Sequence, residues 1–287
     1  MNIFIVIDKN DPAGNNIKDK LLNENKIFSK TSLIFKENKV YQYKNTYLIT
    51  NNSRSIEAEK IDDDIESIIS IKPDLIIFPT THTSKSGIPS LMVHTQGNWG
   101  IAELGGLNKK LGITAENFVK ESLIFLKNNV EIYMGISHFD IAQEATHHGP
   151  VVSCPSMFIE IGSSKDEWEI PEAGRIISDT IIHLIENSDE ILNSNTTTAI
   201  GIGGTHTCQS FMKITLHNDD IAISHVCPKY ALNDLNRDMI LQSMEKSMKP
   251  ASLAILDWKG LGEHKERIIN ILDELNIEYK KSKELKK

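Results

Sequence analysis

The stretch DLIIFPTTHTSKSGIPSLMVH (residues 74–94) shows best how this chain is organised. It opens with the apolar run Asp74–Pro79, which is typical of a buried strand, and Ser90–His94 resembles a second strand. Between them lies a polar loop that carries an imidazole, several hydroxyls and an ammonium group. A loop of this kind at a strand end predicts a site built on a β-sheet.

Strands and helices alternate on both sides of this stretch. We expect further strands at Asn2–Ile7, Val40–Thr50, Met157–Ile161, Thr197–Gly203 and Leu253–Trp258. We expect helices ending near Leu22 and over Ile61–Ser70, Ala115–Lys127, Pro171–Glu186, Leu235–Met248 and Glu263–Leu275. Phe211–Leu216 and Ile221–Val226 are expected to pair as a hairpin. The pattern predicts an α/β fold, a mixed β-sheet flanked by helices on both faces.

The composition predicts one cytoplasmic domain over residues 1–287. No linker or repeat divides the 287 residues, and the three cysteines are too widely spaced for a zinc finger. No signal peptide and no apolar run of about 18 residues is present, so no membrane contact is expected. The tail from about residue 279 is rich in lysine.

The net charge of −8 argues against a protein that coats DNA or RNA nonspecifically. A local basic patch is still compatible with a tRNA enzyme. Candidates are Lys109-Lys110 and the terminal lysines Lys280, Lys281, Lys283, Lys286 and Lys287. Alternatively, these lysines are a solvated surface and a frayed tail.

Six of the ten histidines lie at expected strand ends or turns: His82, His94, His147, His148, His206 and His225. Ligand sites of open α/β sheets form at such ends. The loop after Phe78 adds Thr81, Thr83 and Lys85, which suit a phosphate or an ester carbonyl, although a hydroxyl-rich turn is the simpler interpretation.

The segment His94–Gly100 has a glycine on either side of Asn98-Trp99. Gly97 would let the backbone approach a ligand closely, and Trp99 would stack on a base such as the terminal adenine of tRNA. A core tryptophan is the alternative.

The segment 137–150 carries the densest group of polar side chains. If Phe139–His147 is helical, Asp140, Glu144 and His147 share one face, and Gly149-Pro150 ends the helix. The Glu144–His147 spacing then suits a shared metal ion or proton, and His148 points elsewhere, free to act as a base or a second ligand. A pair of histidines at a helix end is the alternative.

A glycine-rich turn follows the strand at 197–203. Gly203, Gly204 and Thr205 can offer backbone N–H groups to an oxyanion or a phosphate, and His206 is the strongest single candidate for a site residue. The turn lacks the ending of a P-loop, and no helix clearly follows it, so a dinucleotide fingerprint is not expected.

Six segments in order resemble the archaeal and plant-type D-aminoacyl-tRNA deacylases. They are THTSKSGIPSLMVHTQGNWG (81–100), EATHHGP (144–150), SMFIEIGSS (156–164), GIGGTHT (201–207), HVCPKYAL (225–232) and ILDWKGL (255–261). The resemblance implies hydrolysis of the ester bond of D-aminoacyl-tRNA, broad D-amino acid specificity and chiral proofreading. It also implies zinc dependence and a fold like that of phosphorylases and peptidyl-tRNA hydrolases.

Within this resemblance we assign roles to the residues ourselves. Zn²⁺ is expected on some of His82, His94, Glu144, His147 and His206, where it would activate water. His148, His206, Thr205 and Glu144 are the expected catalytic residues, with oxyanion stabilisation by Gly203–Thr205. Lys85 and Lys229 are expected to hold tRNA phosphates.

Two alternatives differ in class from a deacylase. One is a phosphorylase-fold hydrolase that acts on nucleosides or peptides, and the other is a non-catalytic RNA-binding module. The partner expected here is D-aminoacyl-tRNA, bound by a monomer.

Overall fold

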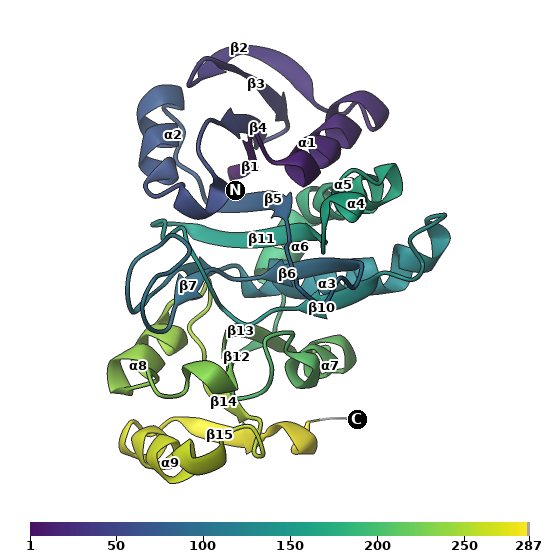
Figure 1. The fold of residues 1–287 in the computed structure, drawn as a ribbon. Helices are drawn as coiled ribbons and strands as arrows, with labels where there is room; N and C mark the ends of the chain where they lie inside the picture. The colour runs from purple at the N-terminus through teal and green to yellow at the C-terminus, as the bar shows by residue number, and fades with distance from the viewer. Residues whose placement is uncertain (286–287) are drawn as a thin grey trace.

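The computed structural model describes residues 1–285 and is built around a mixed β-sheet (Figure 1). Its strand order is β10-β6-β11-β5-β1-β4-β3-β2, with β9 beside β11. β1 runs parallel to β4 and β5, whereas β11 is antiparallel to β6 and β3 is antiparallel to both its neighbours. The strands are β1 (Ile3–Asp8), β2 (Ser29–Phe35), β3 (Asn38–Tyr43), β4 (Thr46–Asn51), β5 (Leu75–Thr81), β6 (Ser90–His94), β9 (Ile113–Thr114), β10 (Asp140–Gln143) and β11 (Pro155–Gly162). The mixed sheet predicted from the sequence is confirmed.

Helices cover both faces of this sheet, as predicted. The alternating side chains of β1 show why, because Ile3, Ile5 and Ile7 pack into one core cluster and Phe4 and Val6 into another. The first cluster includes α1 (Pro12–Asp19), α3 (Glu116–Asn129) and α5 (Pro171–Glu186), and the second includes α2 (Ile61–Ile69). The short helices α4 (Lys165–Trp168) and α6 (Ser188–Asn193) flank α5.

A second sheet, all parallel, has the order β13-β12-β14-β15. Its strands are β12 (Thr197–Ile202), β13 (Ile221–Cys227), β14 (Leu253–Leu256) and β15 (Glu278–Lys281). α8 (Arg237–Glu245) and α9 (Lys265–Glu274) pack on one face, and α7 (Gln209–His217) packs on the other. α3 contacts β6 and β10 of the main sheet and β13 of this one, so it joins the two sheets. A small ribbon of β7 (Gly97–Asn98) and β8 (Lys110–Leu111) stands apart.

Several predicted elements differ from the structure. The predicted hairpin is wrong, because Phe211–Leu216 lies within α7 and β13 runs parallel to β12. Phe211, Ile214 and Thr215 are its buried residues, which is helical spacing. Val40–Thr50 is two strands, β3 and β4, joined by a turn at Lys44, whose φ is +51°.

The C-terminal segment is not a frayed tail where the structure describes it. Lys280 and Lys281 belong to β15, which pairs with β14. Lys286 and Lys287 lie outside the described residues.

No helix within residues 1–285 combines the length and the apolar character that a membrane crossing would require.

Candidate active site

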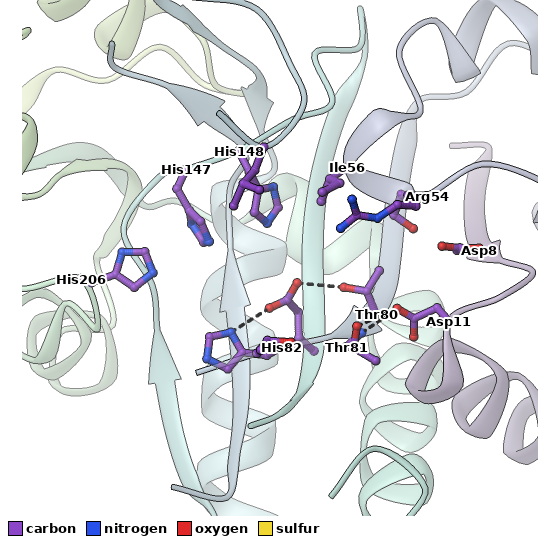
Figure 2. A pocket seen from close by; sticks show the side chains of 14 residues that line it. Asp8, Asp11, Arg54, Ile56, Thr80, Thr81, His82, His147, His148 and His206 are labelled. Carbon is purple, nitrogen blue, oxygen red and sulfur yellow. Dashed lines mark hydrogen bonds and ion pairs between the residues drawn. The ribbon is translucent and has the colours of Figure 1, made fainter. Parts of the chain in front are cut away.

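The candidate active site lies where loops of the two sheets meet. The loop after β10 is tied to the second sheet by two backbone hydrogen bonds: Ala145 N–H donates to the His206 carbonyl at 2.7 Å, and Thr146 N–H donates to the Val226 carbonyl at 3.0 Å. Figure 2 shows the result, with His206, His147 and His148 facing side chains of β5 across one cavity.

Glu160 of β11 is a buried carboxylate at the centre of this site. It accepts a hydrogen bond from the Thr80 hydroxyl at 2.8 Å, and its oxygens lie 3.4 Å from His82 Nδ1 and 3.6 Å from His94 Nε2. Burial alone would raise the pKa of Glu160, but these two imidazoles hold it well below its usual range. Glu160 in turn raises the pKa of His82 and of His94 against the opposing effect of burial, with a further contribution from Glu144.

Three imidazoles share one hydrogen-bonding pattern. In His94, His147 and His148 the Nδ1 atom lies 3.2, 2.8 and 2.7 Å, respectively, from a nearby backbone carbonyl oxygen. A carbonyl only accepts, so Nδ1 carries the proton and Nε2 keeps its lone pair when the ring is neutral. Burial lowers the pKa of His147 well below its usual range and that of His148 to about 4, so both are neutral at physiological pH.

Glu144 is a second buried acid of the site. Its two oxygens are buried and accept no hydrogen bond from residues 1–285, and the same holds for His94 Nε2. Glu144 Oε1 lies 3.1 Å from His206 Nε2 and Oε2 lies 3.5 Å from His82 Nδ1. The Tyr230 hydroxyl lies 2.9 Å from His206 Nδ1 and orients that ring.

The donor atoms are close enough together to hold a metal ion. Three groups of three side chains bring their ligand atoms within 4.8 Å of one another. They are His94–His147–His148, Glu144–His147–His206 and His82–Glu144–Glu160. Neutral imidazoles with Nδ1 bonded to a carbonyl, beside a buried acid that accepts no hydrogen bond, are the donor set that a divalent metal such as Zn²⁺ uses.

Three cavities open onto this cluster. One of about 390 Å³ reaches Asp8 and Arg54, one of about 480 Å³ reaches Trp99 and Asp234, and one of about 670 Å³ runs between β6, β10 and α7. His147 and His148 line the first two, and His82 and His206 line the first and third. A substrate with three arms can therefore be held with its reacting centre at the histidines.

Five of the six predicted histidines gather here, and the sixth does not. His225 lies buried in β13, where its Nε2 donates to the Lys246 carbonyl at 2.8 Å. The predicted metal ligands are divided between groups, since His147 and His206 share one with Glu144, whereas His82 and His94 flank Glu160.

The helix predicted for Phe139–His147 is wrong. Asp140–Gln143 is the strand β10, paired with β6, and Glu144 to Gly149 form a loop. Glu144 and His147 still meet, but through the loop and not through helical spacing. Asp140 is exposed, away from them.

Gly97 and Trp99 contact other parts of the protein. A side chain at Gly97 would meet the Leu111 backbone at 2.7 Å, and Gly97 N–H donates to the His148 carbonyl at 2.7 Å. Trp99 is 5% exposed and donates its indole N–H to the Val226 carbonyl. Trp99 packs in a core cluster, as the alternative of a core tryptophan expects, and it also lines a cavity, so its stacking on a base stays a prediction.

Gly204 and Thr205 of the predicted oxyanion site line a different cavity from the histidine cluster, so this role stays a prediction. Gly203 N–H donates a hydrogen bond to the Cys227 carbonyl. Lys229 lines the same separate cavity as Gly204 and Thr205. A helix, α7, does follow this glycine turn, contrary to expectation. In the loop after β5, Thr81 donates its N–H and hydroxyl to Asp11, Thr83 lines the cavities, and Lys85 is exposed.

Three residues of the site were missed from the sequence. Glu160 is an acid in an otherwise apolar strand. This pattern indicates a buried charge that is paired with polar or charged side chains. Asp11 caps α1 by accepting from Gly14 N–H at 2.7 Å and also holds Thr81. Nothing in the sequence indicated a role for Tyr230, apart from its place in the segment HVCPKYAL.

Comparison with known proteins agrees across the whole chain. The sequence model described as D-aminoacyl-tRNA deacylase matches residues 69–280. Curated D-aminoacyl-tRNA deacylases of Thermococcus kodakarensis and Pyrococcus abyssi are 37% and 38% identical to the chain, each over 96% of it and 98% of their own length. The crystal structure of a conserved protein of unknown function, AF0625, superimposes with a TM-score of 0.86 at 27% identity, covering 99% of this chain and 96% of that one.

Proposed function

The chain belongs to the D-aminoacyl-tRNA deacylase family, and from this premise we propose that the cluster around Glu144 is where the ester bond of D-aminoacyl-tRNA is hydrolysed. The family is one of enzymes, so the alternative of a non-catalytic RNA-binding module is wrong. The observation that carries the proposal is the buried Glu144, without a hydrogen bond from residues 1–285, between His147 and His206 where three cavities meet.

We further propose that Glu144, His147 and His206 hold Zn²⁺. Two partly exposed imidazoles and one buried carboxylate form the donor set typical of a catalytic zinc with an open position. A bound Zn²⁺ is a Lewis acid that lowers the pKa of water toward about 7.

The remaining side chains position this centre and move protons. His148, neutral at physiological pH with Nε2 unprotonated, accepts the proton of the attacking water and returns it to the leaving ribose oxygen. The charged pair of Glu160 with His82 holds these two side chains in place next to the proposed zinc ligands. Lys85, exposed at the rim, contacts a tRNA phosphate.

Broad D-amino acid specificity follows from the cavity of about 670 Å³, which we assign to the amino acid side chain. Ile88, Met92, Ala142 and Met212 give it apolar walls, and Asp140 and Lys213 also line it. Filling it with Met212→Trp is expected to slow release of D-tryptophan far more than release of D-alanine. Equal slowing of both would contradict the assignment.

Deacylation of D- and L-tyrosyl-tRNA under single-turnover conditions tests the site. Glu144→Gln and His147→Ala are expected to lose at least about 100-fold in rate, the usual effect of losing a general acid–base group or a metal ligand. The exposed His138→Gln is the control and should retain the wild-type rate.

Metal analysis gives a second readout that does not depend on turnover. One zinc per chain is expected in the wild type and less in His147→Ala, measured on protein purified without added metal. Full activity in metal-free protein would refute the zinc proposal. The location of the active site would then be tested by the substitutions alone.

A further inference from the structure

A cavity of about 650 Å³ lies on the second sheet, apart from the three that meet at the histidines. The chain passes from β12 to β13 on one side and later to β14 on the other, so the strand order reverses between β12 and β14. In parallel sheets with helices on both faces, ligands bind in the crevice at such a switch point, beyond the carboxyl ends of the strands. This cavity occupies that place, because it is lined by Gly204 after β12 and by Asp257–Gly260 after β14.

A glycine turn after β12 lines this crevice. Gly204 has φ +84°, and a side chain at Gly260 would come within 2.6 Å of Gly204 N. The N–H groups of Gly204 and Thr205 have no acceptor among residues 1–285. Successive free amides in a glycine turn are donors that suit a phosphate.

The charge of the crevice is opposite to that of the chain. Lys229, Lys259 and Lys283 line it, and none of them has an ion pair within the described residues. Asp257 is the one acid among its lining residues, so the crevice carries a formal charge of +2 in a chain of −8. A local positive field of this kind attracts a polyanion that the rest of the surface repels.

Trp258 gives the same crevice an aromatic wall. The ammonium groups of Lys265 and Lys281 lie 4.7 and 4.3 Å from the centre of its ring, which adds positive charge at the rim. Aromatic and cationic groups side by side are how proteins hold single nucleotides of an RNA strand.

The crevice and the candidate active site share one loop. Thr205 and Cys208 line the crevice, whereas His206 between them faces Glu144. A strand whose esterified 3′ end lies at His206 therefore reaches the crevice with a nucleotide that precedes the end.

We propose that this crevice binds a phosphate-bearing nucleotide of the tRNA acceptor strand, adjacent to the aminoacylated terminal adenosine. The proposal rests on the proposed function, and it assigns to the second sheet the capture of RNA. A free mononucleotide shares the chemistry, so the test separates the two sources.

The test is the salt dependence of binding of uncharged tRNA, measured by fluorescence anisotropy. The triple variant Lys229→Ala/Lys259→Ala/Lys283→Ala is compared with Lys30→Ala/Lys39→Ala/Lys127→Ala, which removes the same charge from exposed sites away from the crevice, two of them on β2 and β3 at the opposite end of the molecule (Figure 1). The slope of log Kd against log salt is expected to fall by about 2 in the crevice variant, at roughly 0.7 for each single-stranded phosphate that a lysine no longer neutralises, and to stay unchanged in the control.

Two further measurements sharpen the test. In single-turnover deacylation, the crevice variant should need more enzyme than the wild type to reach half-saturation. AMP should compete with tRNA for the wild type.

Equal salt slopes in the crevice variant and the wild type would overturn the proposal. Loss of AMP binding in the variant without loss of tRNA affinity would overturn it in favour of a free-nucleotide site. A failure of the proposed function is visible separately, as wild-type protein that binds tRNA but does not release D-tyrosine.

Discussion

His225 is expected to make folding stability depend on pH between about 6.5 and 4. The side chain is fully buried, and Nε2 donates to a carbonyl while Nδ1 lies 3.2 Å from the Thr146 hydroxyl. Burial lowers the pKa of His225 from its ordinary 6.5 to about 4. The folded chain therefore stays neutral at this position in a range where the unfolded chain binds a proton.

The sign and the size follow from this difference. Above pH 6.5 neither state is protonated at His225, and stability is unaffected. As the pH falls from 6.5 toward 4, the unfolded state gains the proton, so the free energy of unfolding falls by roughly 1.4 kcal/mol per pH unit, or about 3 kcal/mol in all.

Urea unfolding at a series of pH values measures this effect. The half-buried His147 and His148 also have lowered pKa values and add to the wild-type slope, so the informative quantity is the difference between wild type and His225→Gln. That difference should change by about 3 kcal/mol between pH 7 and pH 4. The exposed His138→Gln serves as control. If His225→Gln keeps the wild-type dependence, the reasoning is refuted, whatever the variant's stability at pH 7.

Three further substitutions test how the scaffold holds the site. Asp11→Ala removes both the cap of α1 and the acceptor for Thr81, so we expect about 1–2 kcal/mol less stability in urea unfolding and a higher KM. Lys120→Met leaves three carbonyls without the ammonium they share, among them that of Asn218, and at roughly 1–3 kcal/mol for each buried unpaired group it should lower the Tm clearly, whereas exposed Lys127→Met should not. Phe118→Ala opens a cavity in the main core and should cost about 3–5 kcal/mol by the same assay; a destabilisation below about 1 kcal/mol would contradict its packing.

Much of the fold could be predicted because long elements carry strong periodicity. Pro171–Glu186 is helical over the expected range, since Pro171 opens it and its isoleucines and leucine face the core. Short segments were less informative. Asp140–Gln143 is a strand because β6 supplies its hydrogen bonds, and nothing local in four residues indicates that.

The site was predictable in its residues but not in its arrangement. Histidines next to glycine and threonine marked the loops, and five of them meet. The partition into a neutral group around His147 and a charged group around Glu160 depends on burial and on which nitrogen faces a carbonyl, and neither is visible in sequence. Likewise, we expected the backbone at Gly97 to approach a ligand closely, whereas the backbone of Leu111 packs against Gly97.

The two hydrogen bonds that tie the loop after β10 to the second sheet have a consequence for how the protein is handled. Glu144 and His147 come from one sheet and His206 from the other, so the reacting groups are assembled only when the two sheets are docked. During refolding, the far-UV circular dichroism can therefore recover before turnover does. Turnover, not helix or strand content, is then the sensitive measure of whether a preparation is native.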